Sequence, residues 1–189
     1  MEGSADRLLA ARLVGADNDL AAAIRRVLAA EGAQLLEPLA TEDSEDLDIL
    51  VFIASGATRP PIANTTAADF SGDVGNGLRA AFLALKSGVA SMRRNARGGS
   101  IVFVAPPAGA HRAFDALTQG LRLMIKATAL ELGPERIRAN IVLPGSGENP
   151  LCRPCTPADI APVVAFAASR RSLFMTGADL VVDGGAMAR

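Results

Sequence analysis

The stretch from Gly98 to Gly145 constrains the fold of this chain more than any other part of it. Ser100–Ala105 is a continuous apolar run of strand length, with two glycines before it and two prolines after it. A long helical pattern, Phe114–Leu132, follows and is stopped by a Gly-Pro pair. Ile137–Leu143 is a second apolar run, closed by Pro-Gly. Strand, crossover helix and strand predict one β-α-β unit of a parallel sheet.

Two motifs in the second half of the chain resemble a known family. Ala129–Gly145, A-L-E-L-G-P-E-R-I-R-A-N-I-V-L-P-G, is similar to the segment that follows the active-site helix of short-chain dehydrogenases/reductases. Thr176–Gly185, T-G-A-D-L-V-V-D-G-G, resembles the last strand of that family. The resemblance implies a Rossmann-like fold: a doubly wound parallel α/β sheet in three α/β/α layers.

Length and composition bound the class of protein. The 189 residues are predicted to form one Rossmann-like domain, residues 1–189, and half of them are hydrophobic, enough for a sizeable core. Nineteen basic and twenty acidic residues leave a formal net charge of −1, so no nucleic-acid partner is expected. No apolar run reaches membrane-spanning length, and residues 1–10 are too polar for a signal peptide. We therefore expect no membrane partner and a cytoplasmic location.

The first half of the chain predicts a shortened version of the fold. A strand over Leu8–Val14, a helix capped by Asn18 or Asp17, and a strand over Gln34–Glu37 form a second β-α-β pattern. Leu47–Ala54 then resembles the family's fourth strand, which leaves no sequence for the family's third strand and its neighbouring helices. The other predicted elements are a loop over Thr58–Asp73, helices over Val74–Asn95 and Thr156–Ser169, and a strand over Leu180–Val182.

The family's phosphate-binding turn is degraded here. Of its glycines only Gly15 remains, and Asp19 and Ala21 stand where glycines let the backbone approach a pyrophosphate. A carboxylate at this place repels phosphate and offsets the attraction of the helix N-terminus. Glu37 stands where an acid could bind a ribose, although a strand-end residue is the simpler interpretation.

Pro144 and Gly145, which follow the predicted strand Ile137–Leu143, match the family's pattern. Together with Gly15 and Glu37 they are interpreted as remnants of a cofactor site. The prediction is that this chain binds no cofactor and that NAD or NADP is bound by a partner subunit.

The resemblance also places the family's catalytic groups, and none is present. The family's Tyr, an acid/base, falls at Phe114, and its Lys falls at Thr118. The Ser falls at Ala105 or Pro106, neither of which carries a hydroxyl group. No shift of the alignment restores the phenol, because the chain contains no tyrosine.

The family's Asn falls at Gly77, with Asn76 one residue away and expected to face elsewhere. Other residues could supply chemistry in its place. His111, the sole histidine, and Asp115 lie near the old active site, and Cys152 and Cys155 have the spacing of a redox pair. A loop histidine and two ordinary thiols are the favoured interpretations, and no metal site is predicted.

The long helix Phe114–Leu132 has a second apolar face. In the family this helix and the helix before it commonly pair with the same two helices of another chain. The alternative is a helix buried wholly within its own domain. The predicted interface residues are Leu78, Phe82, Gly120, Leu123, Ala127 and Leu130.

These observations lead to one function hypothesis and two alternatives. The leading hypothesis is a non-catalytic subunit with a short-chain dehydrogenase fold. It would support a catalytically intact paralogue, or further copies of itself, in a tetramer that acts on a substrate such as a hydroxyacyl-CoA. The alternatives are a divergent NAD(P)-dependent oxidoreductase with non-standard catalytic residues and a non-enzymatic regulator that senses a nucleotide.

Overall fold

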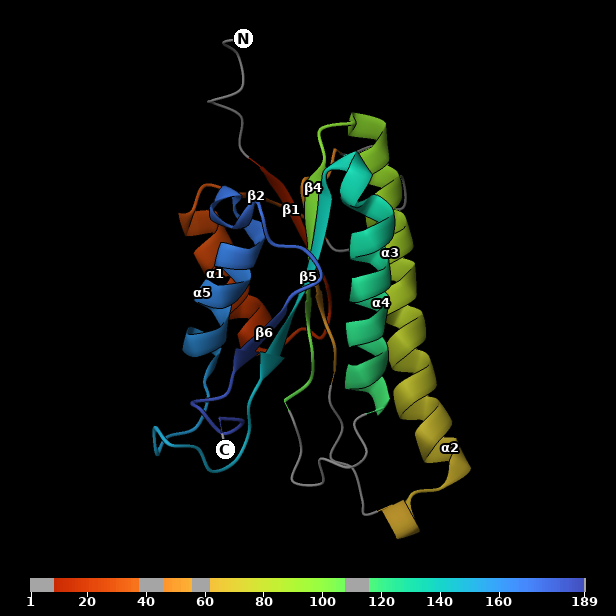
Figure 1. The fold of residues 1–189 in the computed structure, drawn as a ribbon, viewed down its shortest axis with the longest axis vertical. Helices are drawn as coiled ribbons and strands as arrows, with labels where there is room; N and C mark the ends of the chain where they lie inside the picture. The colour runs from red at the N-terminus through yellow and green to blue at the C-terminus, as the bar shows by residue number, and fades with distance from the viewer. Residues whose placement is uncertain (1–8, 38–45, 56–61, 108–115, 189) are drawn as a thin grey trace.

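Six parallel strands form a single sheet in the order β2-β1-β3-β4-β5-β6 (Figure 1). The computed structural model describes residues 9–37, 46–55, 62–107 and 116–188. The strands are β1 Ala10–Gly15, β2 Gln34–Leu36, β3 Ile49–Ile53, β4 Gly99–Val104, β5 Ile137–Pro144 and β6 Asp179–Val182. The main helices are α1 Asp19–Ala30, α2 Ala67–Phe70, α3 Asn76–Asn95, α4 Ala116–Leu132 and α5 Pro157–Ala168.

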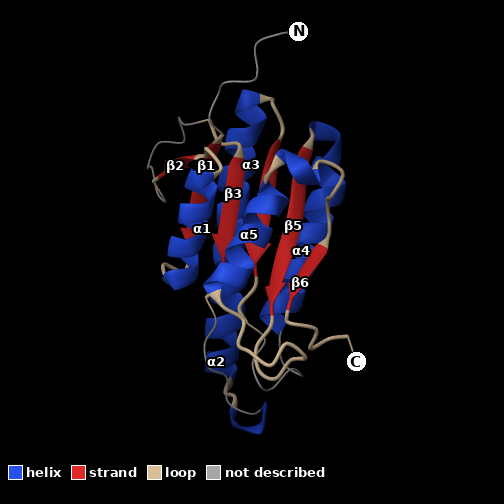
Figure 2. Cartoon of the chain, turned by 90° about the vertical axis from the view of Figure 1, so that its left-hand side faces the viewer, coloured by secondary structure: helices blue, strands red, loops and turns tan. Residues whose placement is uncertain are grey.

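Helices cover the sheet on both faces, as the views from two directions show (Figures 1 and 2). The core cluster that includes helices α1 and α5 takes Ile49, Val51 and Ile53 from β3. The cluster that includes α3 and α4 takes Leu50 and Phe52 from the same strand. Because successive side chains of a strand point to opposite faces, a strand buried on both sides reads as one apolar run. The prediction of a doubly wound, three-layer α/β/α fold is confirmed.

The strand order reverses direction at β1. From β1 the chain goes outward to β2, then returns to place β3 on the other side of β1. Ligands of doubly wound sheets bind at such a switch point, outside the carboxyl ends of the strands. In the described part of the chain no strand lies beyond β2, so the sheet is shortened where the family's third strand would be.

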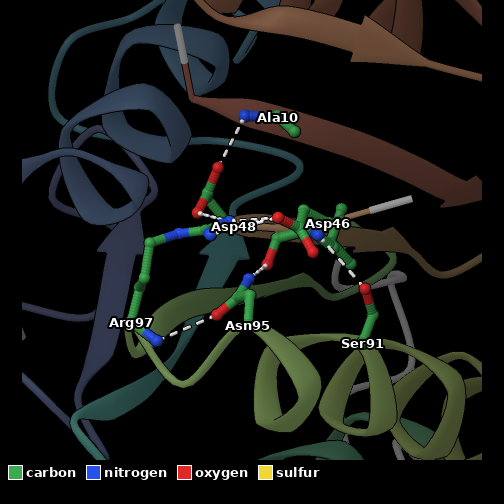
Figure 3. A network of polar contacts seen from close by, with 7 residues as sticks. Ala10, Asp46, Asp48, Ser91, Asn95 and Arg97 are labelled. Atoms are coloured by element: carbon green, nitrogen blue, oxygen red, sulfur yellow. Dashed lines mark hydrogen bonds and ion pairs between the residues drawn. The ribbon is translucent and has the colours of Figure 1, made fainter. Parts of the chain in front are cut away.

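A polar network fixes the segment that enters β3 after this shortened connection (Figure 3). The carboxylate of Asp48 accepts a hydrogen bond from the backbone N–H of Ala10 at 2.9 Å. The Leu47 backbone is held twice, with its N–H donating to Ser91 Oγ at 3.1 Å and its carbonyl accepting from Asn95 at 2.9 Å. These contacts join the amino ends of β1 and β3 to α3. The switch point lies at the other end of these strands, their carboxyl end.

The prediction of a loop over Thr58–Asp73 is wrong in its second half. A short 3-10 helix, Ile62–Asn64, is followed by α2, a five-residue π-helix over Ser71–Gly75, and α3. Thr66 and Asp69 form a reciprocal capping box, with Asp69 N–H donating to Thr66 Oγ1 at 3.1 Å and Thr66 N–H donating to Asp69 at 3.0 Å. The T-A-A-D spacing is the signature of such a helix start, although its last residue is Asp rather than Glu or Gln.

Where the structure describes the chain, no helix combines the length and apolar character that a membrane span requires.

Candidate functional site

A pocket of about 410 Å³ opens at the switch point. It lies between the carboxyl ends of β1 and β3 and the first turns of α3, where the fold is expected to bind ligands. Its described lining residues are Gly15, Ala16, Phe52, Ile53, Ala54, Ser55, Gly72, Asp73, Asn76, Gly77 and Ala80.

Backbone packing explains the glycine that survives at the end of β1. Gly15 has φ +109°, and a Cβ atom there would collide with the carbonyl oxygen of Ile53. The same carbonyl accepts a hydrogen bond from the N–H of Ala16 at 2.9 Å. Gly15 is thus required by the close approach of β1 and β3, whether or not a phosphate is bound.

The start of α1 does not fit a pyrophosphate. The Asn18 side chain caps the helix by accepting from the Ala21 N–H at 3.1 Å, so one amide donor is already occupied. Asp17 is exposed and pairs with Arg25 at 2.8 Å, and Asp19 is an exposed acid in the first turn. The Asp19 carboxylate beside the helix N-terminus opposes a phosphate there, whereas the charge of Asp17 is balanced by Arg25. No α1 residue is among the pocket's described lining residues.

The other residues interpreted as remnants of a cofactor site are Glu37, Pro144 and Gly145. Glu37 is exposed just after β2. Pro144 ends β5, and the N–H of Gly145 donates to the Val182 carbonyl at 2.8 Å. A Cβ atom on Gly145 would lie 2.5 Å from the Cα of Asp183, so this glycine allows β5 and the end of β6 to approach closely.

The described tetrad positions contain no group for proton transfer. Ala105 and Pro106 are buried at the end of β4, and Thr118 is buried on α4 with 7% of its surface exposed. A Cβ atom on Gly77 would lie 2.8 Å from Leu117 Cδ1, so an asparagine there would require Leu117 to move. Phe114, His111 and Asp115 lie outside the described residues.

Asn76 corrects one expectation, because it lines the pocket instead of facing away from it. The π-helix before α3 carries an extra residue per turn and so changes which residues of the next turn face the sheet. Asp73 and Ser55 are the other polar residues among the described part of the lining. No motif of the sequence indicates Asp73, since only the turn geometry brings it to the pocket.

The amino group of Lys126 contacts residues at the start of β6, outside the pocket. Its amino group donates to the Gly177 carbonyl at 3.0 Å and pairs with Asp179 at 3.4 Å. Arg122 binds the same carboxylate at 2.6 Å. Burial works to raise the pKa of Asp179, but hydrogen bonds and charge from Arg122 and Lys126 hold it below its ordinary value. These contacts tether α4 to β6 and leave Lys126 no role in the pocket.

Both cysteines are free thiols, and each makes a separate contact with a backbone carbonyl. Cys152 is exposed and its thiol points to the Pro150 carbonyl at 3.6 Å, while the Cys155 thiol points to the Val182 carbonyl at 3.5 Å. Burial raises the pKa of the Cys155 thiol, with a further contribution from Asp159. A raised pKa disfavours the thiolate that redox or nucleophilic chemistry needs. Within the described residues no group of three or more His, Cys, Asp or Glu could hold a metal ion.

The predicted interface residues divide into two groups. Leu123 and Leu130 are 68% and 84% exposed, Phe82 is 53% exposed, and Ala127 is exposed as well. Gly120 instead packs within the chain, since a Cβ atom on it would lie 2.7 Å from Leu78 Cδ2. Gly120 and Leu78 therefore belong to the contact between α3 and α4, which lie side by side in Figure 1. We call the exposed group, Phe82, Leu123, Ala127 and Leu130, the α3/α4 apolar face.

Comparisons with known proteins agree with the fold. A family model described as enoyl-(acyl carrier protein) reductase matches residues 27–148 and 146–187. Trans-4-hydroxycyclohexanecarboxylate dehydrogenase of Sinomonas cyclohexanicum is 34% identical over 164 residues, which cover 77% of this chain. The match spans 62% of that relative, less than two thirds of its length.

Solved structures superpose on nearly the whole chain. An oxidoreductase of the short-chain dehydrogenase/reductase family from Burkholderia thailandensis has a TM-score of 0.84 and 25% identity, covering 97% of this chain and 94% of that one. A short-chain dehydrogenase from Leptospira borgpetersenii with bound NAD⁺ has a TM-score of 0.78 at 18% identity, over 94% of this chain and 92% of that one. The family match over most of the sequence and the common fold lead to one conclusion: the chain belongs to the short-chain dehydrogenase/reductase family.

Proposed function

We propose that this chain is a non-catalytic subunit that supports a catalytically intact short-chain dehydrogenase in a hetero-oligomer. The observation that carries the proposal is the absence of tyrosine from all 189 residues. The family's acid/base step requires a phenol that the chain does not have. The described tetrad positions add no substitute, because Ala105, Pro106 and Gly77 carry no titratable group and Thr118 is buried.

The start of α1 supports a second part of the proposal, that NAD or NADP is bound by the partner and not by this chain. Asp19 places negative charge beside the helix N-terminus, and the Asn18 side chain occupies one of its amides. The sheet also lacks, in its described part, a strand beyond β2 to form the adenine side of the site.

Assembly is supported by the α3/α4 apolar face. Leu130 and Leu123 are among the most exposed large hydrophobic side chains of the described residues. Contiguous exposed apolar surface commonly marks a protein interface. We propose that this face meets the equivalent helices of the intact dehydrogenase.

The substrate of the complex is proposed only as a class. The name of the Sinomonas relative refers to a cyclic hydroxy acid. A hydroxylated carboxylic acid or its CoA thioester is therefore the class we propose for the partner.

The relatives' names favour a second candidate, a divergent NAD(P)-dependent oxidoreductase, because they describe dehydrogenases. Purification of the native complex separates the two candidates. The first predicts a co-purifying intact dehydrogenase and no turnover of NAD or NADP by the isolated chain. Turnover that persists after contaminating enzymes are removed, and that disappears on substitution within this chain, would establish the second. Calorimetry adds a direct check, since a dissociation constant for NAD in the micromolar range contradicts the proposed loss of the cofactor site.

A further inference from the structure

The loop of residues 146–155, between β5 and the start of α5, is folded around one asparagine, and we call this loop the strap. The Asn149 side chain donates to the Arg153 carbonyl at 2.7 Å and accepts from the Leu151 N–H at 3.1 Å. The Asn149 carbonyl accepts from the Cys152 N–H at 2.9 Å. These bonds give the strap a defined shape, although it is neither a helix nor a strand.

The strap lies against the chain that follows β6. A Cβ atom on Gly184 would lie 2.5 Å from Asn149 Oδ1, and one on Gly185 would lie 3.2 Å from Pro150 Cγ. Figure 2 shows the loops of this region gathered beyond the ends of β5 and β6. These are the carboxyl ends of the strands, the edge at which open α/β sheets bind ligands. The position of the strap therefore decides what can reach this part of that edge.

One ion pair fastens the strap to α5. The two terminal nitrogens of Arg153 donate to the two carboxylate oxygens of Asp159, at 2.7 and 2.6 Å. Asp159 also accepts from the N–H and the hydroxyl group of Thr156, at 2.9 and 2.7 Å. The Thr156 bonds belong to the cap of α5 and do not involve Arg153. Loss of Arg153 would therefore detach the strap while the cap remains.

The Cys155 thiol lies at the end of the strap, beside this ion pair. The Cys155 side chain is partly buried against the core cluster of α1 and α5, and its thiol points to the Val182 carbonyl at 3.5 Å. Burial raises the pKa of this thiol, whereas the positive charge of Arg153 works to lower it. Cys152 is exposed in the same loop.

We infer that the strap opens and closes as a unit, that the Arg153–Asp159 pair is its latch, and that opening brings the Cys155 thiol into contact with solvent. In the closed state the strap holds this thiol against β6. Breaking the ion pair releases the strap and leaves α5 capped by Thr156. The inference concerns the motion of one loop and does not depend on the proposed assembly or on the cofactor.

Thiol alkylation measures the opening. In a Cys152→Ser background, Cys155 is the only thiol of the chain. There Arg153→Gln should raise the rate at which iodoacetamide modifies Cys155 by about threefold to fivefold, as expected for the loss of one well-oriented exposed ion pair. The change of charge alone has the opposite sign, because removal of the cation raises the thiol pKa and slows the reaction. A rate equal to or below that of the Cys152→Ser parent overturns the inference.

Arg171→Gln in the same background is the matched control. Arg171 makes an exposed ion pair just after the other end of α5, with Glu31 at 2.8 Å. Its removal should leave the alkylation rate at that of the parent, and thermal unfolding should show that both variants are folded. An equal acceleration in Arg171→Gln would show that the whole fold is loosened and would reject the latch.

Hydrogen exchange gives a second readout that a purely structural role of Arg153 would not produce. The Leu151 and Cys152 amides, whose bonds lie within the strap, should exchange faster in Arg153→Gln. The amides of α5 should exchange as in the parent, because the Thr156 cap is kept. Faster exchange throughout α5, or unchanged exchange of the two strap amides, contradicts an opening confined to the strap.

Discussion

At the scale of single residues, two positions that align with the family's catalytic groups, Thr118 and Gly77, take part in packing within the chain. Thr118, aligned with the family's lysine, is buried against the sheet face of α4. Gly77, aligned with the family's asparagine, accommodates Leu117 where a side chain would otherwise stand. A polar side chain introduced at either position would enter this packing, and burying a polar group without a partner is costly. A single such substitution is therefore expected to destabilise the fold.

Thr118→Lys tests this argument directly. We expect it to destabilise the protein by several kcal/mol, because an ammonium group loses its hydration on burial. Burial lowers the pKa of a lysine, so the destabilisation should shrink as the pH rises and the amine becomes neutral. Denaturant unfolding at several pH values measures both effects.

Gln119→Lys is the control, since it places the same charge at the adjacent exposed position and should change stability by only a few tenths of a kcal/mol. A Thr118→Lys protein as stable as this control would show that the position opens to solvent. Under the proposed function, adding Phe114→Tyr to Thr118→Lys should give no dehydrogenase activity, because Asp19 and Ala21 stand where the family's phosphate-binding turn has glycines.

At the scale of elements, the R-A-N segment Arg138–Asn140, part of a motif that resembles the family, has a structural role. The buried Arg138 of β5 donates to the carbonyls of Ala167 at 3.0 Å and Ser169 at 3.0 Å, at the end of α5. Asn140, two residues on, donates to the Met175 carbonyl at 3.0 Å and accepts from the Ala178 N–H at 3.1 Å. The R-A-N segment thus fixes the end of α5 and the entry to β6.

The helix α5 offers a pH-dependent test at its other end. The Asp159 carboxylate accepts hydrogen bonds from Arg153 at 2.7 Å and from the Thr156 N–H at 2.9 Å. These bonds, that from Arg153 above all, hold the pKa of Asp159 well below its ordinary value. A depressed folded-state pKa stabilises the protein above the unfolded value of about 3.9, and this stabilisation is lost as the pH falls below it.

Asp159→Asn should accordingly unfold at lower urea concentration than wild type at pH 7, and the difference should narrow as the pH falls below about 4. Urea midpoints measured from pH 7 to pH 3 give the comparison. Glu148→Gln, at an exposed residue in the loop before α5, should show no such trend. A difference that stays constant through the acid range would mean that the carboxylate's charge is unimportant to this cap.

The sequence allows the sheet to be predicted better than the site. Buried strands such as Ile49–Ile53 are continuous apolar runs, and the order of motifs implies the winding. The local turn at Ser71–Gly75 is a π-helix, and no spacing rule indicates it, so the sequence alone does not predict that Asn76 lines the pocket. A helical wheel places Gly120 on an outer face because it cannot show that α3 passes close beside α4. Contacts between distant segments decide such cases.

At the scale of the whole molecule, the exposed apolar side of α4 bears on whether the chain is a monomer or a subunit of an assembly. Leu123, Ala127 and Leu130 follow one another at the spacing of one helix face, and all three are exposed. The helix buries its other side against the sheet through Leu121 and Ile125. A chain with this surface is expected to cover it in an assembly.

Leu130→Arg is the sharpest test of the assembly, because this side chain is 84% exposed and the substitution should leave the fold of the chain intact. Gly120→Arg is unsuitable, since an arginine there would force α3 and α4 apart within one chain. If the α3/α4 apolar face is an interface, the buried charge should weaken assembly by on the order of 2 kcal/mol or more. Sedimentation velocity of wild type and Leu130→Arg, alone and with the co-expressed dehydrogenase, measures the change.

Leu173→Arg, at another exposed leucine near the end of α5, controls for the added charge. A wild-type chain that stays a folded monomer at micromolar concentration with its partner present would exclude both the interface and the proposed subunit role.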